Sequence, residues 1–257
     1  MIFETHVHYD DKMFDEDRER LLESMQEAGI GRIVNIGADL ASTASSIALA
    51  EKYPFIYAAA GVHPSDAAQL NEHTFQWLCE QTAHEKVVAV GEIGLDYYWE
   101  KDPEVRANQR YWFRRQLNLA REKVLPVSIH SRDAAKDTLD IAKEERLAEI
   151  GGVVHCFSYT VEMAREYLNM GMYLGIGGVL TYKNARVLKE VVDYAPMDRI
   201  VLETDSPYLT PVPNRGKRNS SLNLPYVAEA IAQIKGCSEE EVIAVTEENA
   251  KKLLLRK

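Results

Sequence analysis

The sequence is poor in cysteine and in long apolar runs, which excludes several classes of protein. Its three cysteines, Cys79, Cys156 and Cys237, are scattered and form no Cys-x-x-Cys pair. They therefore predict no disulfide framework, and a reducing cytoplasm is the expected location. No stretch approaches the roughly 20 apolar residues of a membrane span, and the first residues do not resemble a secretion signal. We therefore expect a cytoplasmic protein with no membrane partner.

Basic residues are also in the minority. Lys and Arg number 30 against 40 Asp and Glu, which gives a net charge of −10. Such a protein repels a phosphate backbone at long range, so extended, non-specific binding to duplex DNA is disfavoured. Binding of a nucleic-acid end through a local basic patch and bound cations stays possible, as does a small anionic substrate. Nothing in the sequence indicates an obligate protein partner.

Low-complexity segments and Gly/Ser linkers are absent, and short apolar runs recur instead. The 257 residues suit one (β/α)8 barrel, which typically needs about 250. The runs are rich in β-branched residues and nearly continuous, as expected of parallel strands buried on both faces. The eight predicted strands are residues 2–5, 32–36, 56–60, 87–90, 126–129, 152–154, 172–176 and 199–202.

Amphipathic segments follow most of these runs and predict helices. Examples are residues 15–28, 104–122 and 133–147, the last with Asp133 as its expected cap. Alternating strands and helices indicate right-handed βαβ units, and eight of them predict a closed α/β TIM barrel, a single domain over residues 1–257. Residues 225–234 and 238–255 are expected to form closing helices. An open doubly wound sheet would need a Gly-x-Gly-x-x-Gly turn after the first strand, where His6-Val7-His8-Tyr9 stands.

Polar residues stand where the predicted strands end. Catalytic side chains of such barrels project from the C-terminal ends of the strands. The residues found there are His6 and His8 after the first strand, Glu92 after the fourth, His130 after the fifth, His155 after the sixth and Asp205 after the eighth. Each alone has an ordinary explanation, such as a core histidine or a turn cap. Their joint placement predicts one cluster of nitrogen and oxygen ligands.

Such a set is typical of a divalent-metal site. Imidazoles and carboxylates suit Zn²⁺, Mn²⁺, Mg²⁺ or Fe²⁺, and six ligands exceed the four of one structural zinc. We therefore expect two divalent metal ions, bridged by Glu92. Asp205 is expected to bind one ion and to accept a proton from a water, so Glu92 and Asp205 are the catalytic candidates. Because side chains alternate along a strand, Glu4 and Glu203 should lie one pleat deeper and orient imidazoles.

Other residues near these strand ends are candidates for substrate contact. His63 ends the third strand, in Gly61-Val62-His63-Pro64, and could contact substrate or a phosphate. The basic loop, Asn214 to Asn219, supplies Arg215, Lys217 and Arg218, which we expect to contact phosphate rather than only solvent. The run Tyr97-Tyr98-Trp99 is expected to pack on itself, with a stacking surface for a base as the alternative. Cys156, of opposite parity to His155, is expected to pack rather than to bind metal.

Taken together, these motifs resemble the TatD family of metal-dependent hydrolases along nearly the whole chain. They include Thr5-His6-Val7-His8, Gly91-Glu92-Ile93-Gly94-Leu95-Asp96, His130-Ser131-Arg132-Asp133, His155-Cys156-Phe157-Ser158, Glu203-Thr204-Asp205-Ser206-Pro207 and Arg215-Gly216-Lys217-Arg218. The resemblance implies a TIM barrel of the amidohydrolase superfamily, the six ligands named above, and nuclease activity, often a 3′→5′ exonuclease or deoxyribonuclease. The family usually has Asp where Glu4 stands, and Asn-Glu-Pro where Asn219-Ser220-Ser221 stands.

Three functions are open at this point. The first is a nuclease that cleaves phosphodiester bonds at DNA or RNA ends with a metal-activated water. The second is a small-molecule amidohydrolase or phosphoesterase. The third is a non-catalytic metal-binding interaction protein. A glutamate in the fourth strand favours the nuclease over barrels that use a carboxylated lysine there, and the presence of Asp205 favours an enzyme over a binder.

Overall fold

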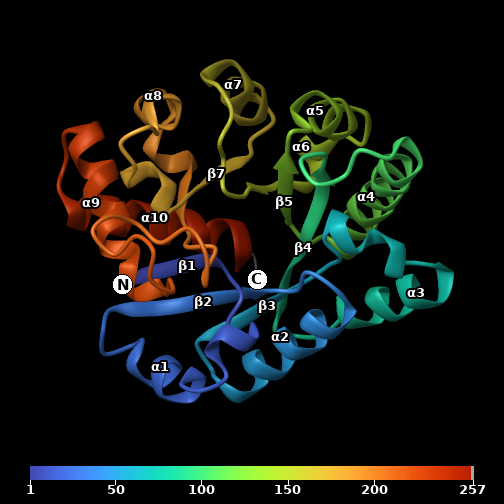
Figure 1. The fold of residues 1–257 in the computed structure, drawn as a ribbon, viewed down its shortest axis with the longest axis horizontal. Coiled ribbons are helices and arrows are strands. Elements are labelled where there is room, and N and C mark those ends of the chain that lie inside the picture. The colour runs from blue at the N-terminus through green and yellow to red at the C-terminus, as the bar shows by residue number, and fades with distance from the viewer. Residues whose placement is uncertain (256–257) are drawn as a thin grey trace.

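A single ring of parallel strands forms the centre of the molecule. The computed structural model describes residues 1–255 and pairs eight parallel strands in chain order, β1 to β8. A parallel bridge between Val7 and Ser206, with the His8 N–H donating to the Ser206 carbonyl at 2.9 Å, joins the first strand to the segment after the last. Figure 1 shows the helices arranged around these strands, so the predicted (β/α)8 barrel is confirmed.

The strands agree with the predicted apolar runs in number and order, and several extend further toward their C-terminal ends. Their bounds are β1 Ile2–Val7, β2 Ile30–Ile36, β3 Ile56–Ala60, β4 Val87–Asp96, β5 Val127–Arg132, β6 Gly152–Val154, β7 Tyr173–Ile176 and β8 Ile200–Leu202. The expectation that Glu92 lies past the end of its strand is wrong. Glu92 lies in the middle of β4, because Gly94 to Asp96 continue to pair with His130 to Arg132 of β5.

Helices connect the strands on the outside of the barrel. They are α1 Arg18–Ser24, α2 Leu40–Lys52, α3 Glu72–Gln81, α4 Pro103–Lys123, α5 Ala135–Glu144, α6 Leu147–Ile150, α7 Val161–Asn169, α8 Arg186–Tyr194, α9 Leu224–Lys235 and α10 Glu239–Leu254. Five 3-10 turns accompany them, η1 Lys12–Phe14, η2 Pro64–Gln69, η3 Gly178–Thr181, η4 Met197–Arg199 and η5 Ser221–Asn223. Within residues 1–255, no helix is both long enough and apolar enough to cross a bilayer.

Two predicted helices differ from the structure. The segment 15–28 is helical only over α1, and the segment 133–147 is helical over α5, with the separate helix α6 beginning only at its last residue. Asp133 is not the cap of α5, because its backbone is left-handed, at φ 52°, and the helix begins after Ala134. Apolar periodicity located the buried faces of these segments but not the turns that interrupt them. The closing helices expected near the C-terminus correspond to α9 and α10.

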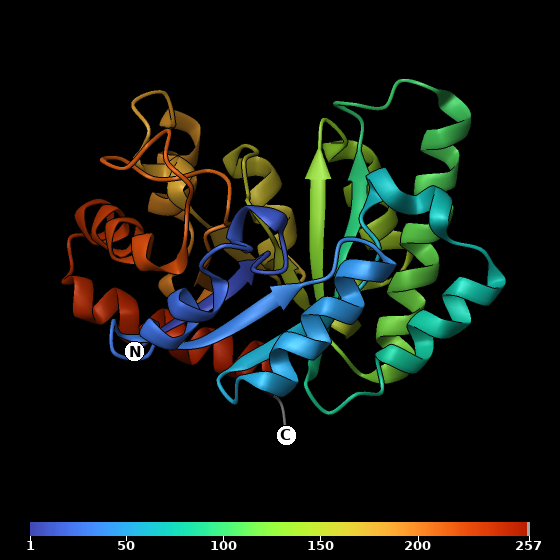
Figure 2. The same cartoon turned by 60° about the horizontal axis from the view of Figure 1, so that its bottom comes forward.

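The barrel interior divides into an apolar lower half and a polar upper half. Apolar side chains from the strands pack together with the end of α10, and the residues of this cluster are Phe3, Val34, Ile36, Ala59, Val88, Ala89, Val153, Tyr173, Val201, Ala250, Leu253 and Leu254. Figure 2 shows α10, in red, along the lower ends of the strands. A larger apolar cluster fills the layer between strands and helices. This apolar cluster closes one end of the barrel, and the polar residues predicted to form the site lie at the other end.

Two strands interrupt the strict alternation of side chains. The register shifts in β1 between Glu4 and Val7, and in β4 between Val90 and Ile93. Glu4, predicted to share a face with His6, accordingly bonds to Thr204 and Ser221 instead of an imidazole. These irregularities decide which side chains of β1 and β4 enter the barrel.

A close approach between β4 and β5 generates a first prediction. Gly94 has φ +148°, and a Cβ built on it would lie 1.9 Å from the carbonyl oxygen of His130. Gly94→Ala should therefore push the two strands apart and lower the free energy of unfolding by roughly 3 kcal/mol or more. Urea denaturation of the metal-free protein measures this loss.

Gly171→Ala is the matched control. Gly171 also has a left-handed backbone, at φ +77°, but a Cβ there meets no atom within 4 Å. This substitution should cost only about 1 kcal/mol, the usual penalty of a left-handed backbone. Equal losses for the two variants would show that the contact between Gly94 and His130 does not constrain the strands.

Candidate metal centre

Six predicted ligands meet at the C-terminal end of the barrel. His6, Glu92 and His130 lie within β1, β4 and β5, and His8, His155 and Asp205 directly follow β1, β6 and β8. His6, Glu92 and His155 are buried, whereas the Asp205 side chain stays 21% exposed. Asp205 has a left-handed backbone, at φ 55°, and its N–H donates to the His6 carbonyl at 3.0 Å. Strained backbone of this kind concentrates at functional sites.

The Glu92 carboxylate lies between two groups of imidazoles. Its Oε2 atom is 3.4 Å from His6 Nε2 and 3.8 Å from His8 Nε2. Its Oε1 atom is 2.8 Å from His130 Nδ1 and 3.1 Å from His155 Nε2. Asp205 Oδ1 completes the first group, at 3.5 Å from His8 Nε2. Each oxygen of Glu92 thus faces a different group of predicted ligands.

The charges in this cluster are strongly coupled. Burial alone would raise the pKa of Glu92, but the surrounding imidazoles, with His155 and His6 foremost, lower it well below its usual value. Burial alone would lower the pKa of His8, yet Asp205 and Glu92 raise it to about 9. His155, beside Glu92 and Glu203, likewise has a pKa well above the usual value despite its burial. The buried negative oxygens thus favour the charged forms of His8 and His155, whereas burial and the neighbouring His155 lower the pKa of His6.

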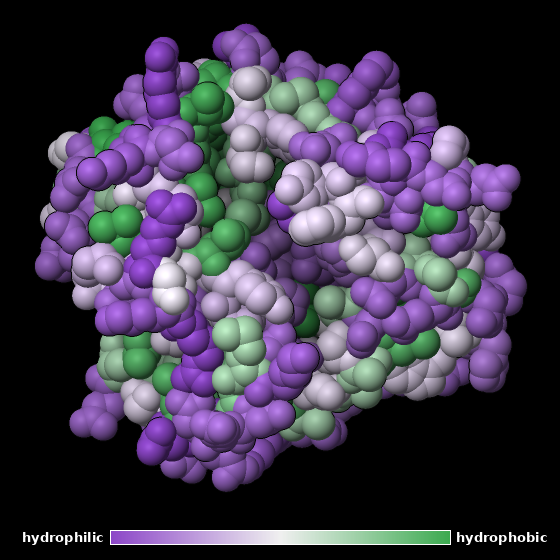
Figure 3. Space-filling view, viewed as in Figure 1, coloured by the Kyte–Doolittle hydropathy of each residue, from purple (hydrophilic) through white to green (hydrophobic). Residues whose placement is uncertain are grey.

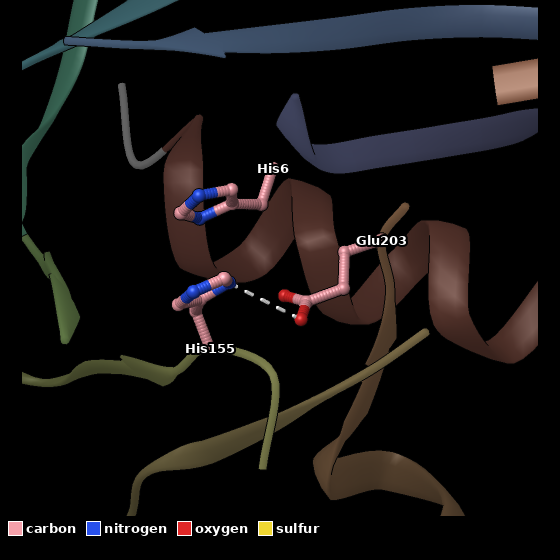
Figure 4. A group of neighbouring side chains, drawn as sticks. All are labelled: His6, His155 and Glu203. Carbon is pink, nitrogen blue, oxygen red and sulfur yellow. Dashed lines mark ion pairs between the residues drawn. The ribbon is translucent and has the colours of Figure 1, made fainter. Parts of the chain in front are cut away.

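These groups fit divalent cations. Three sets of side chains place one ligand atom each within 4.8 Å of the others: His6, His8 and Asp205; His63, Glu92 and His130; and His6, His155 and Glu203. Among residues 1–255, the buried His155 Nδ1 and Glu203 Oε2 atoms find no hydrogen-bond partner. Figure 4 shows the rings of His6 and His155 face to face, with the Glu203 carboxylate directed at His155. A hard or borderline cation suits such a nitrogen and oxygen donor set.

The ligands are oriented by groups behind them. The His8 Nδ1–H donates to the Ile36 carbonyl at 3.0 Å, which leaves the Nε2 lone pair free to bind a metal. His6 Nδ1 is 3.2 Å from the Ser128 hydroxyl, and Glu203 Oε1 is 3.4 Å from His155 Nδ1. Of the two glutamates predicted to orient imidazoles, only Glu203 has an imidazole among its recorded partners.

Glu4 supports the site through the backbone. Its Oε1 atom accepts from the N–H of Thr204 at 2.9 Å and from the N–H of His6 at 3.2 Å. Its Oε2 atom accepts from the Thr204 and Ser221 hydroxyls at 2.7 Å and 3.0 Å. Burial raises the pKa of Glu4 to about 8. Glu4 therefore joins β1 to the segment that carries Asp205.

Two residues of the site were not among the predicted candidates. Asp96 Oδ2 is 3.2 Å from His130 Nε2, and Ser128 contacts His6. Side chains an even number of residues apart on a strand point to the same face. Asp96 is related in this way to Glu92, and Ser128 to His130, so the sequence could have indicated both residues.

His63 lies closer to the ligands than its predicted substrate role requires. Its Nε2 atom is 3.9 Å from Glu92 Oε1, and its ring centre is 4.3 Å from that of His130. Its Nδ1 atom accepts from the Ser65 N–H at 3.1 Å, so the ring proton is on Nε2. Burial lowers the pKa of His63 to about 4. His63 thus lies within the group that it forms with Glu92 and His130, but in this tautomer its Nε2 atom carries a proton and acts as a hydrogen-bond donor.

The basic loop after β8 is only partly available to a substrate. Arg218 is bidentate to Asp17, with both oxygens 2.7 Å away, and lies over the Phe14 ring. Arg215 lies over the Tyr182 ring, 4.2 Å from its centre. Lys217 is exposed. Arg218 thus fastens the loop to the connection after β1, and its predicted phosphate contact would require it to leave Asp17.

A cavity of about 380 Å³ opens onto the cluster. Its lining includes His130, His155 and Asp205 from the ligand set, with Arg132 and Tyr208 nearer the surface. Figure 3 shows this face hollowed near its centre, with hydrophilic atoms in the depth of the hollow. Cys156 also lines the cavity, and burial raises the pKa of its thiol to about 12, so it is a neutral thiol there.

The contact between Glu203 and His155 generates a second prediction. Glu203→Gln keeps the shape of the side chain but removes the charge that orients the imidazole. Affinity for a divalent metal should fall about 10- to 100-fold, as is usual when the group behind a ligand is changed. Isothermal titration of Mn²⁺ or Zn²⁺ into the metal-free protein measures this loss. Glu190→Gln, at an exposed glutamate paired with Arg186 on α8, is the control and should have no effect.

Comparison with known proteins agrees with this geometry. The family model described as TatD related DNase matches residues 3–255. The chain is 46% identical, over 98% of its length and 98% of the relative, to the uncharacterized metal-dependent hydrolase YabD of Bacillus subtilis. It is 34% identical, over 99% of its length and 98% of the relative, to the 3′-5′ ssDNA/RNA exonuclease TatD of Cronobacter sakazakii.

A solved structure gives the same result. The crystal structure of YjjV, a TatD homolog from Escherichia coli, superposes with a TM-score of 0.92 at 30% identity, covering 99% of this chain and 98% of that one. Organophosphorus hydrolases share the fold at 15% identity and a TM-score of 0.62. The family model matches residues 3–255 and the relatives match nearly the whole chain, so the chain belongs to the TatD family of metal-dependent hydrolases.

Proposed function

We propose that this hydrolase is a nuclease that holds two divalent cations and cleaves phosphodiester bonds at the ends of DNA or RNA. The observation that carries the proposal is the position of Glu92, whose two oxygens face two different groups of ligands. A pair of bridged cations can stabilise both the attacking and the leaving oxygen of a phosphoryl transfer. The relative named as an exonuclease supports the choice of substrate.

The site residues have two proposed roles, binding the cations and accepting a proton. Cations held by the six ligands would supply Lewis acidity, which lowers the pKa of a water from 15.7 to about 7 and polarises a phosphoryl oxygen. Burial would raise the pKa of Asp205, but the neighbouring His8, His155 and His6 bring it below its usual value. Asp205 is therefore a carboxylate at neutral pH and, being partly exposed, can accept the proton of the attacking water.

Substrate contacts are proposed for residues around the ligands. The His63 Nε2–H is placed to donate to a phosphate oxygen, and Arg215 and Lys217 would hold a neighbouring phosphate. These positive charges are local, because the net charge of −10 opposes binding of a long duplex. The substrate would accordingly be an end or a short strand.

The free cysteines Cys79, Cys156 and Cys237 fit a reducing cytoplasm.

Metal stoichiometry gives a third prediction. The wild-type protein should bind two divalent ions in native mass spectrometry. His8→Ala and His130→Ala should each retain one, because the two imidazoles face opposite oxygens of Glu92. Glu92→Gln should weaken both ions together. His73→Ala, at an exposed histidine on α3, should still bind two. A single ion in the wild-type protein would exclude the bridged pair.

Turnover gives a fourth prediction. Single-stranded DNA labelled at its 3′ end should lose nucleotides in the presence of Mg²⁺, Mn²⁺ or Zn²⁺ and stay intact with a chelator. Asp205→Asn should lower kcat about 10²- to 10⁴-fold, the usual contribution of a positioned base. Asp140→Asn, at an exposed carboxylate paired with Lys136, should be as active as the wild type.

A panel of neutral esters, amides and small phosphate esters is tested in parallel. Hydrolysis of one of these without cleavage of DNA or RNA would replace the nuclease by a small-molecule hydrolase. Tight metal binding without any turnover would indicate a non-catalytic protein. Undiminished turnover in Asp205→Asn would remove Asp205 as the base while leaving the nuclease in place.

A further inference from the structure

Two exposed aromatic rings form a cluster with Arg132, an arginine that lines the cavity. Tyr98 and Trp99, in the loop after β4, are 44% and 71% exposed. Their rings meet edge to face, with centres 4.6 Å apart. The guanidinium of Arg132, at the end of β5, lies 3.9 Å from the centre of the Tyr98 ring and 5.6 Å from that of Trp99. We refer to Tyr98, Trp99 and Arg132 as the aromatic platform.

The platform is connected directly to the metal centre through Asp96. The Asp96 Oδ1 atom accepts from the N–H groups of Tyr98 at 2.9 Å and Trp99 at 3.3 Å. Its Oδ2 atom is 3.2 Å from His130 Nε2. One carboxylate thus fixes both the start of the aromatic loop and a ligand imidazole. The distance between the platform and the ligands is set by a buried side chain rather than by a free loop.

The cavity extends from the predicted ligands to Arg132, the member of the platform that lines it. Arg132 lines it together with His130 and Asp205. Tyr208, which follows β8, lines it as well and is 52% exposed. The Tyr208 hydroxyl donates to Asp11 Oδ2 at 3.2 Å, which holds this ring in place. A flat group that enters the cavity therefore meets aromatic or guanidinium surfaces contributed by segments far apart in the chain.

Packing of the loop on itself does not account for the platform. Tyr97 does pack: its ring is buried, and its hydroxyl donates to Asp137 at 2.8 Å. Tyr98 and Trp99 meet edge to face, an arrangement that leaves most of the indole in water. Large apolar surface is rarely left exposed beside a functional cavity unless it binds something. Arg132 lies over the Tyr98 ring, so the indole of Trp99, 71% exposed, is the largest aromatic surface that these contacts leave uncovered.

The chemistry of the platform fits a nucleobase. Aromatic rings and guanidinium planes stack on the flat face of any base, and a guanidinium can also pair with the adjacent phosphate. The chain carries a net charge of −10, so attraction between phosphates and distant charges contributes little to binding. Stacking of a base does not depend on the net charge, so it can contribute the affinity that long-range electrostatic attraction does not supply.

We propose that Tyr98, Trp99 and Arg132 bind the base of a nucleotide next to the cleaved phosphodiester, as a stacking subsite for single-stranded nucleic acid. The proposal rests on the nuclease function proposed above and specifies its substrate. A base in a duplex is covered on both faces by its neighbours and is paired, so it cannot reach the platform without leaving the stack. Single strands should bind better than duplexes, with little preference among the bases.

The test measures binding as well as turnover. Asp205→Asn protein with Mn²⁺ is titrated with a fluorescent single-stranded oligonucleotide, and with the same strand carrying abasic sites in its last three nucleotides. Trp99→Ala in this background should weaken binding of the intact strand about 10-fold or more, because one stacking contact is lost. The abasic strand, which has the same phosphates and no bases to stack, should bind equally with and without Trp99.

Two further variants separate stacking from a structural role. Trp99→Phe should restore most of the affinity, because a smaller ring still stacks. Tyr111→Ala removes another exposed aromatic ring, 48% exposed against 71% for Trp99, that lies near Arg115 on α4, away from the cavity lining, and should have no effect. In the active protein, Trp99→Ala should raise KM for a single strand and leave KM for a small phosphate ester unchanged.

The outcomes distinguish this proposal from the one on which it rests. Equal losses on intact and abasic strands would overturn the stacking subsite, because the platform would then act through the backbone or through folding. Unchanged binding of both strands would overturn it as well, while cleavage by the wild type would keep the nuclease. Failure of the wild type to cleave any strand with any metal would overturn the nuclease itself.

Discussion

The buried Glu92 carboxylate is the centre on which the site depends. A charged carboxylate is costly to bury unless opposite charge and hydrogen-bond donors surround it. Imidazoles at the ends of β1, β5 and β6 provide that environment: they lower the pKa of Glu92, which helps to raise the pKa of His8 and His155. Divalent cations can replace the protons that the histidines would otherwise hold. Burying several carboxylates close together is unfavourable without a cation, and the same concentration of negative charge favours the binding of a divalent metal.

The barrel makes this arrangement possible because its apolar packing and its polar site lie in different halves of the interior. The lower half of its interior is filled by apolar side chains and closed by α10, and it supplies the stability that the upper half lacks. The upper half carries imidazoles and carboxylates whose own partners, Ser128, Glu203 and the Ile36 carbonyl, keep them oriented. Irregular register in β1 and β4 adjusts which residues face inward without breaking the ring of strands.

The mouth of the cavity uses a different kind of interaction from its floor. On the floor, charges are buried and coupled at distances near 3 Å. At the mouth, exposed rings and a guanidinium present surfaces that tolerate any base, and Asp96 connects the two regions. Arg218, a member of the predicted phosphate loop, fastens that loop to Asp17. On the proposed function, these few fixed contacts would let a protein of net negative charge bind an anionic chain.

The sequence by itself determined the class of fold and the six candidate ligands that the fold brings together at one end of the barrel. Eight apolar runs in alternation with helices indicate a parallel barrel, and His6, His8, Glu92, His130, His155 and Asp205 stand near their ends. Only the tertiary structure shows that β4 extends past Glu92, that Asp96 contacts His130 and that Ser128 contacts His6. It also shows that the ring of His63 is neutral and that Arg218 is paired with Asp17. Periodicity along a chain reports which faces are buried. The pairing of side chains across strands depends on register shifts and close approaches, such as that of Gly94 to His130, which a linear pattern does not contain.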